Sequence, residues 1–411
     1  MSSAAHYGHL PRSESPPARN ERTHARALAR AVGRAPTGGN HVTVLLDGPQ
    51  TYAAMFNAIE RARDHINIEY YTIEADGPGA ELARRLIAKR RQGVAVNLLY
   101  DSFGSLGTAA RYFAALRDAG VRLCEYNPLA RLSTLLGRTV HRRDHRKVMI
   151  IDGRVGFIGG VNISGVYSVG SAGVMSGRGR RKSGWRDTHV RIEGPVVAGL
   201  QRMFARHWKR CAGAVLQPAL YFPPLAVRGE HRVAVAASEA GVRRNPFYRA
   251  LLAAIESARE RIQLTCAYFV PTRRLLHALV AAAHRGVDVR IVLPGFTDFW
   301  APLHAGRSHY GYLLRAGVRI YERRDTLLHA KTCVIDGVWA SIGSSNIDWR
   351  SFLHNAEANV VVLDAGFASH FERVFDDDVA RCHEVSLDDW LARGVLHRFK
   401  EWLAMRVEFF L

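Results

Sequence analysis

Residues 144–164 read DHRKVMIIDGRVGFIGGVNIS, and residues 328–348 read LHAKTCVIDGVWASIGSSNID. Each stretch contains a histidine, a lysine two positions later and an aspartate five positions after that lysine. The apolar residues on either side of an Asp-Gly pair predict two strands joined by a tight turn. The chain therefore carries the same predicted β-hairpin twice, with the same chemically active side chains at its start.

The similarity between the two halves extends well before these hairpins. Three further pairs of segments match in the same order: AIERARDHINI at 58–68 with AIESARERIQL at 254–264, QGVAVNLLYD at 92–101 with RGVDVRIVLP at 285–294, and DAGVRLCEY at 118–126 with RAGVRIYER at 315–323. Matches in the same order indicate an internal duplication. Helical and strand-like patterns alternate within each half, which predicts the α/β class with two similar α/β/α sandwich lobes.

Four regions are expected along the chain. Residues 1–38 are polar and basic, and we predict that they form a disordered tail. The two lobes are expected over residues 39–215 and 216–385, with the active site at their interface. Residues 386–411 show helical apolar spacing and several basic residues, which predicts an amphipathic helix on a membrane surface or on the body of the protein.

Composition narrows the class of partner. The 411 residues carry a formal net charge of +20, which attracts polyanions, either nucleic acid or a membrane that contains anionic phospholipid. No apolar run reaches the roughly 18–20 residues that span a bilayer. The five cysteines are scattered and include no Cys-x-x-Cys pair, so neither a zinc knuckle nor a disulfide framework is predicted, and a reducing compartment is the simplest interpretation.

The hairpin residues point to phosphoryl chemistry. Side chains two apart on a strand share a face, so His145 and Lys147 point the same way, as do His329 and Lys331. Two imidazoles suit a two-step transfer, in which one attacks phosphorus and the other protonates the leaving alcohol. The lysines, together with Asn162 and Asn346, would bind the phosphate oxygens. Neither a His-Glu-x-x-His motif nor a carboxylate cluster occurs, so no metal or other cofactor is expected.

Carboxylates are expected to support this site in two ways. A nucleophilic histidine needs its tautomer fixed, and Asp187 and Glu357 are the candidates; which carboxylate orients which histidine stays open. Asp152 and Asp336 complete the predicted catalytic set of His145, Lys147, Asp152, His329, Lys331 and Asp336. Because both aspartates sit at turns, we expect them to orient local structure and not to touch substrate. A single such motif arises easily by chance, whereas two at equivalent places in a repeat indicate function.

The paired motifs resemble those of the phospholipase D superfamily over about residues 40–385. The stretches YDSFGS (100–105), WRDTHVRIEGPVV (185–197) and LLHAKTCVIDGVWASIGSSNIDWRSFLHNAEANVVV (327–362) look most like bacterial cardiolipin synthases. Many of those enzymes begin with two transmembrane helices, and this chain resembles the shorter forms without them. The resemblance implies the phospholipase D-like duplicated fold, with His145 as the nucleophile and His329 as the acid and base.

The implied activity is transfer of a phosphatidyl group, with cardiolipin made from phosphatidylglycerol, or from phosphatidylglycerol and another phospholipid, through a phosphohistidine. The alternatives are a phospholipase D-type hydrolase, a phosphatidylserine synthase or a nuclease with the same chemistry. A non-catalytic module that binds anionic lipid is disfavoured because both motifs are intact. The apolar segment 127–143 favours lipid over nucleic acid. We therefore expect a peripheral enzyme on an anionic membrane surface, at the cytoplasmic face of the inner membrane.

Overall fold

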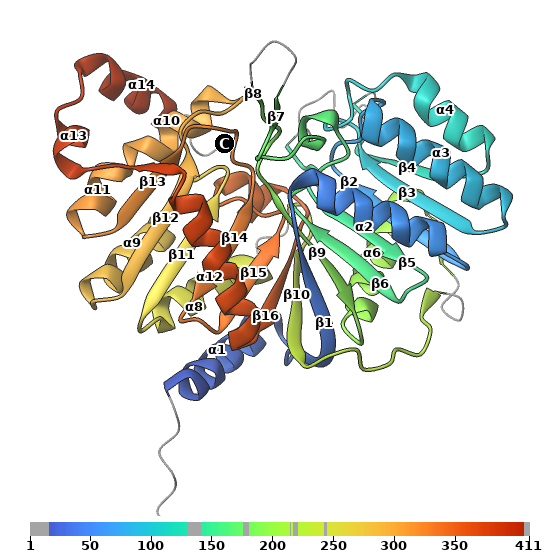
Figure 1. Cartoon of the computed structure of the whole chain (residues 1–411), viewed down its shortest axis with the longest axis horizontal. Helices are drawn as coiled ribbons and strands as arrows, with labels where there is room; N and C mark the ends of the chain where they lie inside the picture. The colour runs from blue at the N-terminus through green and yellow to red at the C-terminus, as the bar shows by residue number, and fades with distance from the viewer. Residues whose placement is uncertain are drawn as a thin grey trace, which may run out of the picture.

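The computed structural model describes residues 16–129, 141–175, 181–213, 215–216, 221–241 and 245–406. The chain forms two lobes that lie side by side and share one 15-stranded sheet (Figure 1). β1 of the first lobe pairs with β10 of the second lobe and joins the two halves of this sheet. The predicted α/β class with two similar lobes is confirmed.

The first lobe contains the elements between the N-terminal helix and residue 213. Its strands are β1 (Thr37–Leu46), β2 (His65–Tyr70), β3 (Ala95–Asp101), β4 (Arg122–Tyr126), β5 (Lys147–Ile151), β6 (Val155–Gly159) and β9 (Thr188–Glu193), with β7 (Val174–Met175) and β8 (Arg181–Lys182) in a separate small hairpin. Its helices within the described residues are α2 (Asp47–Arg61), α3 (Gly77–Arg91), α4 (Ala110–Asp118) and α6 (Val197–Ala212), and η1 (Gly165–Tyr167) is a 3₁₀ turn.

The second lobe repeats this plan. Its strands are β10 (His231–Ser238), β11 (Arg261–Cys266), β12 (Asp288–Pro294), β13 (Arg319–Arg323), β14 (Lys331–Ile335), β15 (Trp339–Gly343), β16 (Glu357–Leu363) and β17 (Cys382–Glu384). Its helices are α8 (Pro246–Ser257), α9 (Arg273–His284), α10 (Trp300–Ser308), α11 (Tyr310–Arg315) and α12 (Ala365–Val379), with one π-helical turn, η2 (Arg350–His354).

Strand order makes the duplication explicit. Outward from the central pair, the first lobe runs β1, β9, β6, β5, β2, β3, β4, and the second runs β10, β16, β15, β14, β11, β12, β13, with β17 added at its edge. In each lobe the last three of these seven strands are parallel, and the strand that carries the motif lies beside them. Equivalent segments of the sequence therefore occupy equivalent places about a pseudo-twofold axis.

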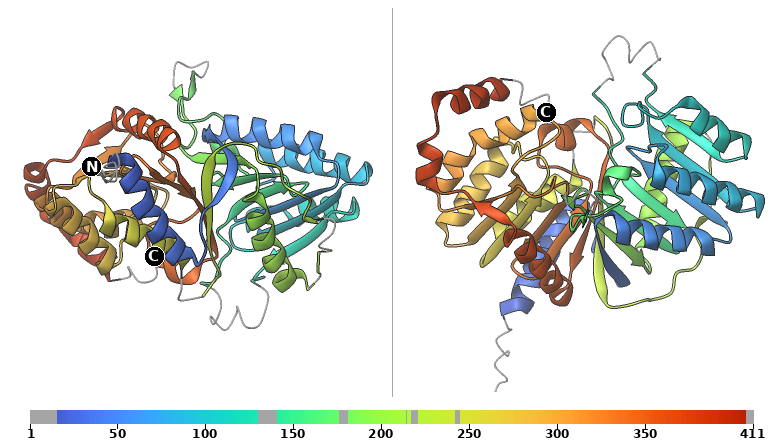
Figure 2. Two further views of the ribbon diagram at one scale, coloured as in Figure 1. Left: turned by 90° about the horizontal axis from the view of Figure 1, so that it is seen from below. Right: turned by 45° about the horizontal axis from the view of Figure 1, so that its top comes forward.

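Helices cover both faces of the sheet in each lobe (Figure 2). In the first lobe, α2, α3 and α4 bury Met55, Leu86 and Leu116 against one face. α6 and α12 bury Phe204 and Phe371 in a core that also holds strand residues of both lobes. This shared core fixes the two lobes against each other, because separating them would expose its apolar surface to water.

Both predicted hairpin turns form as expected. Asp152 and Gly153 have φ of 52° and 62°, and Asp336 and Gly337 have φ of 52° and 60°. Two successive residues with positive φ are the requirement of the type I′ turn, whose twist matches that of the flanking strands. The Asp-Gly pair is therefore explained by local geometry in both copies.

The predicted disordered tail is wrong for the part that the structure describes. Helix α1 (Pro16–Val32) packs on the second lobe and buries Ala25, Leu28 and Ala31 against α8. His24 Nε2 also lies 3.0 Å from Asp336 Oδ2. Apolar residues spaced by three positions form a helical face within this basic segment, and its polar composition obscured them. Residues 1–15 lie outside the described part.

The sequence analysis predicted no disulfide framework, and the structure corrects this expectation. Cys124 in β4 and Cys211 near the end of α6 form a disulfide, with their Cα atoms 6.2 Å apart. The two cysteines are 87 residues apart in the sequence, so only the packing of α6 against the strand brings them together. The pattern of cysteines therefore no longer supports the expected reducing compartment.

The predicted C-terminal helix is divided. Leu387–Leu391 form α13 and Val395–Met405 form α14, with Gly394 preceding the second helix, while residues 407–411 lie outside the described part. α14 packs on α10 but leaves large apolar side chains exposed, among them Phe399 and Trp402. Within the described residues, every helix is too short or too polar to cross a lipid bilayer.

Candidate active site

The two hairpins bring their histidines to one cavity. His145 precedes β5 and His329 precedes β14, which are equivalent strands of the two lobes. Both histidines line a cavity of about 250 Å³ at the interface, and so do Asn162 and Asn346. The structure thus brings together residues that lie far apart in the chain.

The carboxylates pair with the histidines across the interface. His145 Nδ1 lies 3.1 Å from Glu357 Oε1, and His329 Nδ1 lies 2.7 Å from Asp187 Oδ2. Glu357 begins β16 of the second lobe, and Asp187 precedes β9 of the first, so each lobe orients the histidine of the other lobe. This answers the question that the sequence left open, and it leaves Nε2 of each ring for chemistry.

Backbone hydrogen bonds fix this crossed arrangement. His145 N donates to Ala356 O at 2.9 Å, one residue before Glu357. His329 N donates to Arg186 O at 2.8 Å, one residue before Asp187. The two chain crossings are equivalent under the pseudo-twofold axis, and each is an isolated β-bridge, Asp144 with Ala356 or Leu328 with Arg186, that places a histidine beside its carboxylate.

Burial keeps both rings neutral. The side chain of His145 is 12% exposed and that of His329 is 6% exposed. Burial, with the nearby lysines acting in the same direction, lowers the pKa of His145 to about 4 and that of His329 well below its ordinary value. A neutral imidazole whose Nδ1 faces a carboxylate carries its lone pair on Nε2, which is the state that a nucleophile requires.

The two carboxylates differ in their surroundings. Burial raises the pKa of Asp187 to about 6, although Lys331 opposes the shift. Burial acts in the same direction on Glu357, but the His145 ring and Lys147 outweigh it and hold the pKa of Glu357 below its ordinary value. Two further hydroxyls join these pairs: Tyr167 Oη lies 3.1 Å from His329 Nδ1, and Ser344 Oγ donates to Glu357.

The two asparagines line the cavity, whereas the two lysines are not among its lining residues: Lys147 Nζ donates to the carbonyl oxygen of His145 at 2.7 Å, and Lys331 Nζ donates to that of His329. The side chains of Lys147 and Lys331 are buried, and burial lowers the pKa of Lys147 to about 7 and that of Lys331 below its ordinary value. An anion in the cavity would favour their charged forms. The side-chain oxygen of Asn346 is buried without a hydrogen-bond partner in the described part of the chain, so it can accept a hydrogen bond from a ligand donor such as a hydroxyl.

Asp152 and Asp336 do not line the cavity, so their inclusion in the catalytic set is corrected. The Asp152 carboxylate accepts hydrogen bonds from the backbone N–H groups of residues 63–65 at 2.8–2.9 Å. Asp336 accepts from those of residues 259–261 at 2.9–3.2 Å. Each aspartate therefore ties its hairpin turn to the loop before the neighbouring strand, as expected from its position at a turn.

Several cavity residues were not predicted. Tyr71, Arg143, Trp185 and Tyr268 line the cavity, and the edge of the Tyr71 ring faces His145 with ring centroids 4.9 Å apart. Trp185 lies two positions before Asp187, and this proximity to a predicted site residue was an available signal. Tyr71 and Tyr268 follow the ends of β2 and β11, and Arg143 precedes β5, so the direction of each side chain depends on the tertiary fold.

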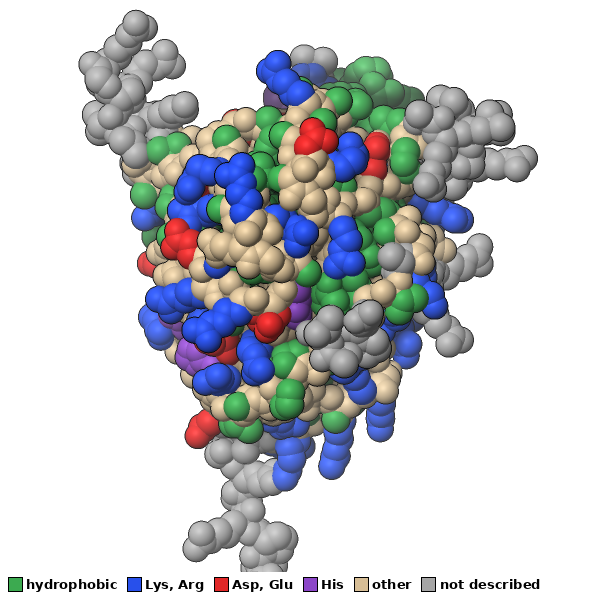
Figure 3. Space-filling view, turned by 90° about the vertical axis from the view of Figure 1, so that its right-hand side faces the viewer, with side chains coloured by type: hydrophobic (Ala, Val, Ile, Leu, Met, Phe, Trp, Pro, Cys, Tyr) green, Lys and Arg blue, Asp and Glu red, His purple; other side chains and the backbone are tan. Residues whose placement is uncertain are grey.

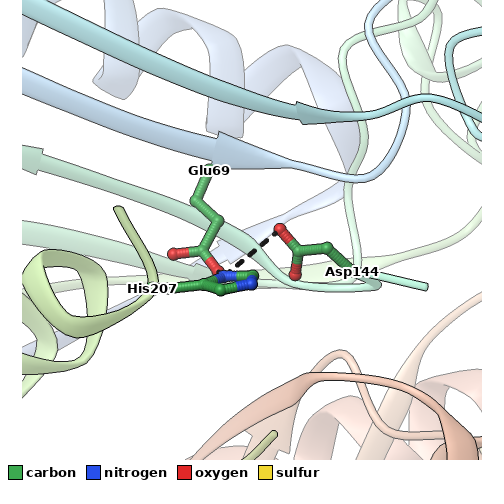
Figure 4. A group of neighbouring side chains, drawn as sticks. All are labelled: Glu69, Asp144 and His207. Atoms are coloured by element: carbon green, nitrogen blue, oxygen red, sulfur yellow. Dashed lines mark hydrogen bonds and ion pairs between the residues drawn. The ribbon is translucent and has the colours of Figure 1, made fainter. Parts of the chain in front are cut away.

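A buried charged cluster lies behind His145. Glu69, Asp144 and His207 point toward one another, with Glu69 Oε1 2.7 Å from His207 Nδ1 and Asp144 Oδ2 3.8 Å from it (Figure 4). Carboxylates and imidazole are metal ligands, but the Arg146 guanidinium already donates to Glu69 Oε1 at 2.9 Å and lies 3.3 Å from His207 Nδ1. A cation thus already occupies this set, and the residues fit an ion-pair network better than a metal ion.

Arg146 joins several elements at this point. It also donates to the carbonyl oxygens of Glu357 and Ser238, so it connects the strand of His145 to the second lobe. Although burial acts in the opposite direction, Arg146 lowers the pKa of Glu69 to about 2. Burial and the charge of Glu69 raise the pKa of Asp144 well above its ordinary value, and the Arg146 guanidinium balances the charge of Glu69.

Removing Arg146 alone should leave the Glu69 charge buried without compensation. We expect Arg146→Met to lower the free energy of unfolding by about 3–5 kcal/mol. The double variant Arg146→Met/Glu69→Leu should recover a large part of this loss, because the buried charge of Glu69 is removed together with the cation that balances it. Urea denaturation of both variants measures the difference, and a double variant no more stable than Arg146→Met would contradict the assignment.

Buried neutral histidines also make stability depend on pH. His189 in β9 is fully buried, and neither ring nitrogen has a hydrogen-bond partner among the described residues. Burial lowers its pKa to about 3. Between that value and the ordinary value of about 6.5, the unfolded chain binds a proton that the folded chain does not, so this group lowers stability as pH falls.

His189→Leu removes this group without adding a charge. Relative to the unaltered chain, the variant should gain about 2 kcal/mol of unfolding free energy when the pH is lowered from about 7 to about 5. Urea denaturation at the two pH values gives this double difference, in which the titration of other groups cancels. His383→Leu, at an exposed position, is the control. An equal change in both variants would show that His189 does not carry the effect.

Comparison with known families identifies this architecture. A family model described as "Cardiolipin synthase, PLD-like domain" matches residues 55–168 and 251–379, which are the corresponding parts of the two lobes. The match includes both histidine motifs.

Named relatives agree over most of the chain. Cardiolipin synthase 2 of Bacillus anthracis is 36% identical over 360 residues, which cover 87% of this chain and 68% of the relative. The cardiolipin synthase of Geobacillus kaustophilus is 36% identical over 377 residues, which cover 91% and 73%.

Solved structures show the same fold at low sequence identity. A phosphatidylserine synthase of Haemophilus influenzae superposes with a TM-score of 0.67 at 14% identity, over 90% of this chain and 95% of that one. A polyphosphate kinase of Porphyromonas gingivalis superposes with a TM-score of 0.56 at 14% identity, over 85% and 49%. These likenesses concern the duplicated fold alone.

Proposed function

The chain belongs to the cardiolipin synthase family with phospholipase D-like domains, and we propose that it makes cardiolipin from phosphatidylglycerol through a phosphohistidine. It is an enzyme of the phospholipase D superfamily that transfers a phosphatidyl group. One observation carries the proposed mechanism: two neutral imidazoles, each paired through Nδ1 with a buried carboxylate, line the same cavity.

In the first step, Nε2 of His145 attacks the phosphorus of one phosphatidylglycerol. The bond between phosphorus and the headgroup oxygen breaks, and glycerol leaves with a proton from His329. The negative charge of the bound phosphodiester raises the pKa of His329, which allows this ring to hold the proton. The assignment of His145 as nucleophile follows the family resemblance, and its greater exposure agrees with it.

In the second step, a hydroxyl of a second phosphatidylglycerol attacks the phosphohistidine. His329 takes the hydroxyl proton, the bond between nitrogen and phosphorus breaks, and cardiolipin forms. The charged forms of Lys147 and Lys331, with the amides of Asn162 and Asn346, stabilise the non-bridging oxygens in both steps. Apart from the two turn aspartates, each of the eight predicted site residues has a role in this scheme. Asp187 and Glu357 orient the histidines.

A lipid substrate is supported by the surroundings of the cavity. Phe103 and Phe299 line it. Phe296, in the loop after β12, and Trp300, the first residue of α10, are also exposed. Phe103 follows β3 at the position equivalent to Phe296 after β12, so the two lobes present exposed aromatic rings from equivalent loops. The apolar segment 127–143, cited in favour of lipid, lies largely outside the described residues.

We propose that these loops dock on an anionic bilayer. Lysine and arginine side chains outnumber acidic ones on the outer face of the first lobe (Figure 3), in keeping with the net charge of +20. Each basic residue near an anionic surface contributes about 1 kcal/mol of attraction. Aromatic rings at the loop ends would enter the headgroup region and bring the cavity to its substrate. Attachment to the cytoplasmic face of the inner membrane remains part of this proposal.

Loss of either imidazole should abolish transfer. We expect His145→Ala and His329→Ala each to lower turnover by at least about 10³-fold, because one removes the nucleophile and the other the acid and base. Lipid mass spectrometry after incubation with phosphatidylglycerol vesicles measures cardiolipin and phosphatidic acid. His383→Ala, at an exposed position away from the cavity, is the matched control. Cardiolipin formation by both cavity variants would disprove the two-histidine mechanism.

The docking surface has its own test. Phe296→Ser/Trp300→Ser should lower partition onto phosphatidylglycerol vesicles by about tenfold or more, because both rings lose their burial in the bilayer. Val227→Ser, which alters an exposed apolar residue elsewhere, should leave partition unchanged. Vesicle sedimentation measures binding, which should also weaken with added salt. Equal partition of the double variant and the unaltered chain would rule out these loops as the docking surface.

A further inference from the structure

The two halves of the cavity differ in charge although the lobes are duplicates. At equivalent positions, the first lobe has Thr72, Ser105 and Ser164, and the second has Tyr268, Asp298 and Asp348. The three second-lobe residues all line the cavity. The two lobes therefore contribute equivalent histidines to the cavity, but at these three positions only the second lobe contributes carboxylates.

Asp298 is the more available of the two carboxylates. Its Oδ1 accepts hydrogen bonds from Tyr268 Oη at 2.7 Å and Thr297 Oγ1 at 2.9 Å. Its Oδ2 has no hydrogen-bond partner within the described residues, and the side chain is exposed at the cavity mouth. Asp348, by contrast, is buried and accepts from the backbone of Ser351 at 2.7 Å, so it serves its own turn.

A carboxylate beside a phosphate site requires an explanation, because it repels the anion that the site binds. Asp298 lies on the side of His329, where its charge favours the protonated ring and partly offsets the burial that lowers the pKa of His329. In the proposed reaction, His329 is the residue that exchanges protons with alcohols. Hydroxyl groups donate hydrogen bonds to carboxylates, so a polyol at this point turns an unfavourable charge into a binding group.

We propose that Asp298 and Tyr268 form a subsite for the polyol headgroup. The subsite holds the departing glycerol in the first step and the glycerol headgroup of the acceptor lipid in the second. The inference rests on the proposed function and adds to it the residues that select the alcohol. In the second step the subsite favours a polyol over water and over alcohols with a single hydroxyl, because only a polyol can donate to Asp298 and present a second hydroxyl to phosphorus.

The test measures how the phosphohistidine divides between acceptors. Phosphatidylglycerol vesicles are incubated with the full chain and equal concentrations of deuterated glycerol and 1-propanol, and the labelled phosphatidylglycerol, phosphatidylpropanol and phosphatidic acid are measured by mass. The ratio of products reports only the second step, since all three arise from the same intermediate. A general structural defect would lower all three products and leave their ratio unchanged.

We expect Asp298→Ala to lower the ratio of labelled phosphatidylglycerol to phosphatidylpropanol by about tenfold, the effect of losing a hydrogen bond to a charged group. Tyr268→Phe should shift the ratio in the same direction by less, because Asp298 is then less firmly held. Asp118→Asn, an exposed aspartate at the end of α4, is the matched control and should leave the ratio unchanged.

Two results would overturn the inference while leaving the proposed function intact. One is cardiolipin formation by the unaltered chain with the same acceptor ratio in Asp298→Ala. The other concerns ethanolamine, added as a third acceptor at the same concentration. A preference for ethanolamine over glycerol that disappears in Asp298→Ala would mean that the carboxylate binds an ammonium group. Absence of every phosphatidyl product from the unaltered chain would instead overturn the proposed function and, with it, the subsite.

Discussion

The structure depends on two histidine–carboxylate pairs that are buried between the lobes and formed across them. Glu357 of the second lobe faces His145 of the first, and Asp187 of the first faces His329 of the second. Neither lobe alone contains a complete pair. A buried carboxylate without a hydrogen-bond partner is costly, so the pairs also favour the one relative placement of the lobes in which both carboxylates have their partner. Assembly of the fold and assembly of the candidate site are therefore one event.

Burial has different consequences for the residues at the cavity and for the ion-pair network of Arg146 behind them. At the cavity it keeps the imidazoles neutral, and next to them it lowers the pKa of the two buried lysines, whose charged forms an anion in the cavity would favour. Behind the strand of His145, burial is offset by Arg146, whose guanidinium balances Glu69 and binds carbonyl oxygens of the second lobe. The protonation of the groups at the cavity therefore depends on whether a ligand is bound, whereas Arg146 and Glu69 stay charged and connect the two lobes.

Duplication explains both the symmetry of the phosphate centre and the asymmetry of its surroundings. A phosphodiester has similar non-bridging oxygens, and two copies of one hairpin suit it. The two sides of the phosphorus have different roles, however, because one receives the nucleophile and the other releases and accepts alcohols. Thr72 and Tyr268, or Ser105 and Asp298, show how equivalent positions diverged around a conserved geometry within one chain.

The sequence alone determined the α/β class, the duplication, the two hairpins and the cavity residues of both motifs, because repeats and strand alternation are local patterns that survive without coordinates. It could not assign Glu357 to His145, join Cys124 to Cys211 or place Asp298 beside the site, since these contacts depend on how distant elements pack. Helix α1 was missed for a related reason: its few apolar residues become a buried face only when the second lobe covers them. Residues close together in the sequence determine strands and turns, whereas contacts across the interface between the lobes depend on the tertiary fold.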